Sequence, residues 1–199
     1  WVLKLMAHEH IIKSVRYWLE TVVIGLNLCP FAKREWVNKR VRFFVTSAVT
    51  EEQLLQDLRA ELEYLGNEAA VETTLLIHPD VLQDFHEYNQ FLNAADGLLV
   101  QMGLGGVYQI ASFHPDYQFA DSEPDDVENY TNRSPYPILH LIREASLERA
   151  IANYPDPDQI PERNMALLRS LGHDRMRALF QGTVVVVADA DGNSIGVLD

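Results

Sequence analysis

The sequence predicts an α/β fold with a small, mostly parallel sheet and additional helices at the N- and C-terminal ends. Three runs, at residues 40–49, 71–79 and 107–115, are rich in β-branched and aromatic residues, as strands are. Amphipathic segments of helical length separate them. A strand-helix-strand-helix-strand order favours parallel neighbours with right-handed connections. Within the third run, residues 107–113 are apolar on both faces except at Gln109 and Ser112, which predicts an interior strand.

The helices before the third strand each have a recognisable pattern. The first is predicted over residues 11–26 by apolar residues at helical spacing. The second begins at Thr50, where Gln53 completes a capping box, and ends at Gly66.

A third helix is predicted over residues 81–102, after the tripeptide His78-Pro79-Asp80. Asp80 is interpreted as its N-cap, with Gln83 as the capping-box partner. This first His-Pro-Asp copy is therefore interpreted as a helix entrance, while His78 remains a candidate for lining a pocket.

The second half of the chain is predicted to be more irregular. Residues 115–130 contain six acidic and no basic residues and are interpreted as a loop. A helix is predicted over 138–152, and two short ones over 162–171 and 174–181, separated by Gly172. The tail, 183–199, is interpreted as two strand runs around an Asp191-Gly192 turn.

Length and composition favour a single domain over residues 1–199. The net charge is −13, but residues 1–43 have eight Lys or Arg and only three acidic residues. We interpret this as a basic end that docks on an acidic body, and we expect no nucleic-acid partner. One cysteine and no apolar segment of bilayer length predict a soluble, cytoplasmic protein without a membrane partner.

The second His-Pro-Asp copy, His114-Pro115-Asp116, precedes no helical pattern. In a parallel sheet it lies at the carboxyl edge, where open α/β sheets bind ligands. His114 is a candidate acid or base that Asp116 orients. The alternative is a turn aspartate and a histidine whose hydrogen bonds are satisfied within the fold.

The segment "NRSPYPILHLIRE" is the densest polar cluster. Ser134 is a candidate helix cap, and Arg133 a candidate clamp for a phosphate or carboxylate. His140 and Arg143 would share a face of the predicted helix with Glu144. The alternative is a capped helix with a surface histidine and an ion pair.

Cys29, with Lys33 and Arg34 one turn on, is a candidate nucleophile or redox thiol. Its apolar neighbours indicate instead a small buried side chain. The sequence has no zinc signature, P-loop or Gly-x-Gly-x-x-Gly motif, so no metal site is predicted and the cofactor stays unknown.

The motifs "GLNLCPFAK", "YQIASFHPDYQFA" and "NRSPYPILHLIRE" together resemble a bacterial family catalogued as domain of unknown function 1415. The resemblance covers residues 10–182 and leaves out the tail. It implies no particular reaction. It directs attention to the polar and reactive residues of the three motifs, which are Cys29, His114, Asp116, Tyr117, Arg133, Ser134, His140 and Arg143.

The leading hypothesis is an enzyme that binds a small anionic molecule. In it, Arg133 and Arg143 hold the anion, His114 and Asp116 supply acid–base chemistry, and Cys29 is a possible nucleophile. Tyr117, Ser134 and His140 complete the ligand site. The alternative hypothesis is a non-catalytic binding or interaction module whose motifs are structural. The sequence specifies neither a substrate nor an oligomeric state.

Overall fold

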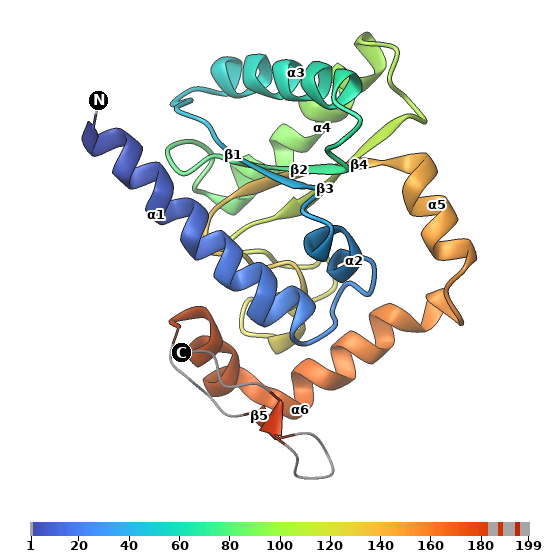
Figure 1. The fold of residues 1–199 in the computed structure, drawn as a ribbon. Helices are drawn as coiled ribbons and strands as arrows, with labels where there is room; N and C mark the ends of the chain where they lie inside the picture. The colour runs from blue at the N-terminus through green and yellow to red at the C-terminus, as the bar shows by residue number, and fades with distance from the viewer. Residues whose placement is uncertain (1, 183–186, 189–193, 196–199) are drawn as a thin grey trace.

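The chain folds around a four-stranded mixed sheet that is covered by helices on both faces (Figure 1). The computed structural model describes residues 2–182, 187–188 and 194–195. The strands, in the order β1-β2-β4-β3 across the sheet, are β1 (Val41–Val45), β2 (Thr73–Ile77), β4 (Ile138–Arg143) and β3 (Tyr108–Phe113). β1 and β2 are parallel, whereas β4 is antiparallel to both β2 and β3. The α/β class is confirmed, but the prediction of a mostly parallel sheet is wrong.

The error arises at residues 138–143, which form β4 and not the first part of a helix. The helix α5 begins only at Glu144 and ends at Ala152. Ile138 packs in the core on one face of the sheet, and Leu139 and Leu141 pack on the other. A short apolar run that is buried on both faces fits helical and strand patterns equally well. Because β4 inserts beside β2, β3 becomes an edge strand, and its predicted interior position is also wrong.

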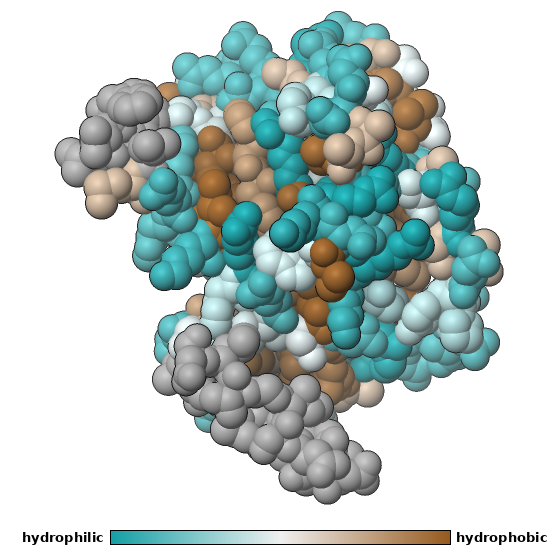
Figure 2. Space-filling model, viewed as in Figure 1, coloured by the Kyte–Doolittle hydropathy of each residue, from teal (hydrophilic) through white to brown (hydrophobic). Residues whose placement is uncertain are grey.

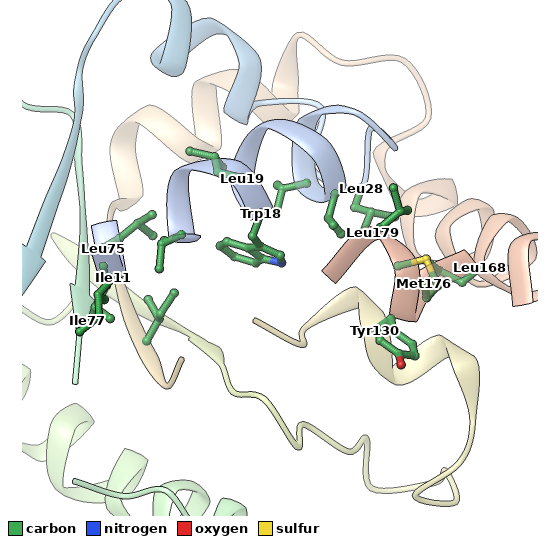
Figure 3. Packing of buried hydrophobic residues seen from close by; sticks show 14 of the residues in the cluster. Ile11, Trp18, Leu19, Leu28, Leu75, Ile77, Tyr130, Leu168, Met176 and Leu179 are labelled. Atoms are coloured by element: carbon green, nitrogen blue, oxygen red, sulfur yellow. The ribbon is translucent and has the colours of Figure 1, made fainter. Parts of the chain in front are cut away.

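One face of the sheet is covered by α1 (Val2–Trp18), its π-helical continuation η1 (Leu19–Ile24), α2 (Ala32–Val37) and α6 (Ile160–Phe180). Figure 3 shows Trp18 between the sheet residues Leu75 and Ile77 and the α6 residues Met176 and Leu179. α1 and η1 together confirm the helix predicted over residues 11–26. A break in α6 at Gly172, with φ 76° and ψ 171°, confirms the predicted interruption there.

The other face is covered by α3 (Glu51–Asn67) and α4 (Phe85–Gln101). The predicted cap of α3 is confirmed, because the N–H of Gln53 donates to Thr50 Oγ1 at 3.3 Å. The predicted cap of the next helix is wrong. Asp84, not Asp80, accepts the N–H of Glu87 at 3.0 Å and begins α4.

Asp80 lies in a loop because the two residues after it pack into the core as a turn. Val81 and Leu82 are buried, and Leu82 has a left-handed φ of 58° that a helix does not permit. The side chain of Gln83 bonds back to the Pro79 carbonyl at 2.7 Å instead of capping a helix. The sequence pattern placed the N-cap at Asp80, four residues before the observed cap at Asp84. It did so because neighbouring residues alone do not show that Val81 and Leu82 pack in the core.

The acidic segment after β3 is a loop until the 3-10 helix η2 (Val127–Thr131), and a second 3-10 helix, η3 (Pro157–Gln159), precedes α6. In the tail, β5 (Val187–Ala188) and β6 (Ser194–Ile195) pair antiparallel, while the predicted Asp191-Gly192 turn lies outside the described residues. Within the part of the chain that the structure describes, no helix combines the length and apolar character needed to cross a bilayer. On the face shown in Figure 2, hydrophilic side chains separate several hydrophobic patches.

Candidate functional site

The two His-Pro-Asp copies lie at the same edge of the sheet. β2 and β3 are both antiparallel to β4, so they run in the same direction. His78 directly follows β2 and His114 directly follows β3. Both side chains have 0% of their surface exposed. The repeated tripeptide therefore places two buried imidazoles at one carboxyl edge, as the sequence predicted for His114.

Both imidazoles hold consecutive carbonyl groups of the loop 79–84. His78 Nδ1 lies 2.9 Å from the Val81 carbonyl oxygen, and His114 Nε2 lies 3.0 Å from that of Leu82. His114 Nδ1 accepts the backbone N–H of Asp116 at 3.0 Å. An acceptor at Nδ1 and a donor at Nε2 define His114 as a neutral tautomer.

Tyr88 of α4 packs against both histidines. Its ring centroid lies 5.7 Å from that of His78 and 5.0 Å from that of His114. The hydroxyl donates to the Ile138 carbonyl at 2.6 Å and accepts the Phe113 N–H at 3.1 Å. Tyr88 thus bridges the end of β3 and the start of β4. The sequence placed Tyr88 only within the helix predicted over residues 81–102, so this role was missed.

Burial sets the protonation of this cluster. It lowers the pKa of His78 from 6.5 to about 4. It also lowers the pKa of His114, although the carboxylates of Asp116 and Asp84 act in the opposite direction. For Tyr88, burial raises the pKa above its usual value. All three side chains are therefore neutral at pH 7.

A shallow depression of about 560 Å³ opens beside this cluster, between the start of α4 and the acidic loop. Its lining residues are Gln83, Asp84, Phe85, His86, Asp116, Gln118, Pro124, Asp125 and Arg133. Arg133 is held in place by bonds to the carbonyls of Tyr117 at 3.2 Å and Pro124 at 2.8 Å. The structure therefore brings Asp116 and Arg133 to one depression, whereas the ring of Tyr117 packs on Phe85, with 5.1 Å between ring centroids.

The acidic loop is organised by Asn129, which is fully buried. Its Oδ1 accepts the Phe119 N–H at 3.1 Å and the Ser122 hydroxyl at 2.7 Å, and its Nδ2 donates to the Glu123 carbonyl at 2.8 Å. These bonds fix the loop that forms one side of the depression. A single asparagine in an acidic, aperiodic stretch gives no sequence signal for this role.

A second depression, of about 440 Å³, lies on the other side of the loop 79–84. Its lining residues are Val49, Thr50, Glu51, Asp80, Val81, Leu82, Gln83, Asp84 and Glu87. The two depressions share Gln83 and Asp84. Across residues 2–182, 187–188 and 194–195, no group of three or more His, Cys, Asp or Glu side chains is arranged to hold a metal ion.

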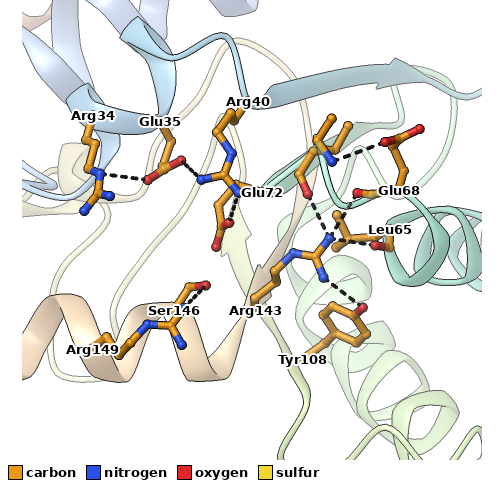
Figure 4. A network of polar contacts seen from close by, with 12 residues as sticks. Arg34, Glu35, Arg40, Leu65, Glu68, Glu72, Tyr108, Arg143, Ser146 and Arg149 are labelled. Atoms are coloured by element: carbon orange, nitrogen blue, oxygen red, sulfur yellow. Dashed lines mark hydrogen bonds and ion pairs between the residues drawn. The ribbon is translucent and has the colours of Figure 1, made fainter.

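Three other residues singled out in the sequence lie away from the depression or inside the fold. Arg143 is paired with Tyr108 at the start of β3 (Figure 4). His114 follows the other end of β3, so the two residues lie at opposite ends of the strands. Ser134 is buried and donates to the Tyr136 carbonyl at 2.6 Å, within a turn and not at a helix start. His140 lies in the middle of β4, with Nε2 2.7 Å from Thr73 Oγ1, and burial lowers its pKa to about 4.

Cys29 packs against the core beneath α1 and α6 and is partly buried. Burial raises the pKa of its thiol. Two backbone hydrogen bonds lower this pKa, but their effect is smaller than that of burial. A raised pKa leaves the thiol protonated at neutral pH, which is the reverse of what a nucleophile needs. The backbone groups that lower the pKa of Cys29 belong to Phe31 and Ala32, and neither residue lines the depression.

The protein belongs to the α/β class, with a mixed sheet. Its two His-Pro-Asp segments follow β2 and β3 at the same end of that sheet. More particularly, the chain belongs to the family described as "Protein of unknown function (DUF1415)", which matches residues 10–178. This match confirms the resemblance drawn from the three motifs. Neither the curated proteins nor the solved structures contain a match to the chain.

Proposed function

We propose that the protein is a binding module for a small molecule that carries both an anionic group and an amine. The ligand would occupy the depression between the start of α4 and the acidic loop. The observation that supports this proposal is the lining of the depression, which includes the guanidinium of Arg133 and the three carboxylates of Asp84, Asp116 and Asp125.

The charges argue for a ligand of mixed sign. Arg133 uses Nε and Nη2 to hold the loop, and its Nη1 makes no hydrogen bond to a described residue, so it remains available to a carboxylate or phosphate. Asp116 and Asp125 are exposed and available to an ammonium group. A purely anionic ligand would also face the three carboxylates. The anionic ligand expected from the sequence is therefore refined to one that also bears an amine.

A binding role is favoured over acid–base catalysis because of the environment of His114. Both of its ring nitrogens are bonded to backbone groups, and its side chain is fully buried. A general acid or base must reach the proton that it transfers. Asp116 remains exposed, and its carboxylate can contact an ammonium group directly, which favours recognition over chemistry.

Calorimetric titration of the full chain with three matched probe sets tests this proposal. The sets are α-amino acids, carboxylates of the same skeleton without the amine, and amines without the carboxylate. We expect measurable binding for the zwitterions and weaker binding for both other sets. Asp116→Asn should weaken zwitterion binding about fivefold, the upper range for an exposed ion pair.

The matched control is Asp121→Asn, since Asp121 is exposed in the same loop but does not line the depression. It should bind like the unmodified chain. Equal affinity for zwitterions and simple carboxylates would contradict the amine component. A complete lack of binding in all three sets would contradict the binding module itself.

A further inference from the structure

We propose that the imidazoles of His78 and His114 form a pH-sensitive clasp. It holds the loop 79–84 against the sheet while both rings are neutral and releases the loop when His78 takes up a proton. This inference goes beyond ligand binding, because it concerns the loop itself and applies whether or not the depression is occupied.

The geometry of the clasp is two adjacent carbonyls held by two rings from different strands. The Val81 carbonyl is bound by His78 and the Leu82 carbonyl by His114. These two hydrogen bonds hold Leu82 in a left-handed conformation, with φ 58°, which is unfavourable for a leucine. Release of the rings therefore removes the contacts that keep this backbone in place.

Protonation is most disruptive at His78. Its Nδ1 is the donor to Val81, so an added proton must bind Nε2. Nε2 is buried and has no hydrogen-bond partner among the described residues. The ring is also stacked on Tyr88, with an interplanar angle of 17°. A charged imidazolium here would be buried without an acceptor, and the ring can recover hydration only by leaving the site, which breaks its bond to Val81.

His114 responds less strongly to acid. A proton on its Nδ1 would face the Asp116 N–H, which is repulsive, but the carboxylates of Asp84 and Asp116 favour the charged ring. For His78, burial and the neighbouring His114 oppose the charged ring, and only the Val81 carbonyl favours it. The remaining titratable group that packs against both rings is the Tyr88 phenol, which burial keeps neutral.

Release of the loop changes the surface on both sides of it. Gln83 and Asp84 line both depressions, and Asp84 caps α4 through the Glu87 N–H. The two buried side chains of the loop, Val81 and Leu82, become accessible when it leaves. The loop is therefore expected to couple a proton at His78 to the shape of both depressions and to the first turn of α4.

The size of the effect follows from linkage. With a pKa of about 4 in the closed loop and 6.5 for a free imidazole, the released population rises about twentyfold between pH 7 and pH 5. Amide hydrogen exchange measured by NMR on the full chain tests this directly. After correction for intrinsic rates, the protection of the Glu87 amide should fall about twentyfold.

Variants separate the clasp from general acid effects. His78→Asn keeps a donor near the position of Nδ1 but does not titrate, so it should retain Glu87 protection at pH 7 and lose its pH dependence. His10→Asn, at an exposed position in α1, is the matched control and should behave like the unmodified chain. Persistence of the pH dependence in His78→Asn, or its absence in the unmodified chain, would overturn the proposal.

If His78→Asn does not fold, the imidazole titration of His78 in the unmodified chain decides the question. The proposal requires a midpoint well below the ordinary value of 6.5, with the backbone amide shifts of residues 80–84 following the same midpoint. A His78 that titrates normally, or loop amides that do not follow it, would overturn the clasp.

Discussion

Arg143 donates a hydrogen bond of 2.7 Å to the carbonyl oxygen of Leu65, which lies 78 residues earlier in the chain. The same nitrogen lies 2.8 Å from the Val71 carbonyl and 3.3 Å from that of Glu68 (Figure 4). Carbonyls at the end of a helix lack intrahelical partners, and a cation there also complements the helix dipole. Arg143 thus fastens the end of α3 to the end of β4.

Arg143→Ala should lower the free energy of unfolding by about 3 kcal/mol, because three partly buried carbonyls lose a charged donor at once. Arg143→Lys should recover about half of this loss, since one ammonium replaces a fork of donors. Urea denaturation measures both. Arg149→Ala in α5 is the matched control, because Arg149 is exposed and, among the described residues, its guanidinium bonds only to the Ser146 side chain. A loss as small as that of the control would show that Arg143 is not needed for stability.

Tyr88→Phe should cost about 2 kcal/mol of unfolding free energy, because it leaves the Ile138 carbonyl and the Phe113 N–H without their bridge. The ring packing against both histidines would remain. The control is Tyr64→Phe, at a side chain that is 40% exposed, and it should be nearly neutral. Thermal and urea unfolding of the two variants should differ clearly, and equal stabilities would refute the bridge.

The elements that the sequence predicted well are those with strong local signals. α3 has leucines at helical spacing and a capping box at Thr50, so both its existence and its start could be predicted. The break at Gly172 was also visible, because glycine alone accepts the positive φ found there without strain. These signals depend only on neighbouring residues.

β4 could not be identified in the same way. Its strand character depends on being sandwiched between β2 and β3, with both faces buried, and no local pattern reports that. The consequence for the candidate site was large. A helix over 138–152 would place Arg143 one turn from His140 and near Arg133. In the strand, Arg143 is instead separated from Ile138 by the full length of β4.

The predicted position of His114 and Asp116, at the carboxyl end of a strand, depended on where that strand ends. Neighbouring residues alone indicate that point. What the sequence could not show is that His114 turns inward to a carbonyl while Asp116 turns outward to the depression. The direction of a side chain at a strand end depends on what packs above it, here Tyr88 and Phe85 of α4. That contact joins segments 26 and 29 residues apart along the chain.

Gly25→Ala should destabilise the protein by about 3 kcal/mol. A Cβ at this position would lie 2.2 Å from the Thr21 carbonyl oxygen, inside the π-helical turn where the Gly25 N–H bonds to Glu20 at 2.9 Å. Gly97→Ala in α4 is the control, because a Cβ there meets no atom within 4 Å. It should stabilise by about 0.5–1 kcal/mol through helix propensity. A neutral Gly25→Ala would show that the turn relaxes to a regular helix.

Cys29 should react slowly with iodoacetamide in the native protein below pH 8, because burial raises the pKa of its thiol. Labelling followed by mass spectrometry should reach the rate of a free thiol only after denaturation in urea. Rapid labelling of Cys29 in the native protein would show an accessible thiolate and would support the hypothesis that Cys29 is a nucleophile.

His140 gives a prediction about acid stability that is independent of the loop 79–84. Thr73 donates its hydroxyl hydrogen to the Leu141 carbonyl, so it accepts the Nε2–H of His140, and the neutral ring is the Nε2–H tautomer. Burial lowers the pKa of His140 to about 4, whereas the unfolded value is about 6.5. The unfolded chain therefore binds the proton first. The stability is fully present above pH 6.5 and is lost as the pH falls toward 4.

Because His140 remains partly accessible to solvent, we expect it to account for about 2 kcal/mol of this loss and not the full value of the shift. His140→Gln retains a donor near Nε2 without a titrating ring, so its unfolding free energy should fall less steeply between pH 6.5 and 4. His86→Gln, at an exposed position of α4, should keep the original slope. Urea denaturation at several pH values measures the slopes. If the slope for His140→Gln matches that of the unmodified chain, His140 titrates at its ordinary pKa and burial in β4 does not hold it neutral.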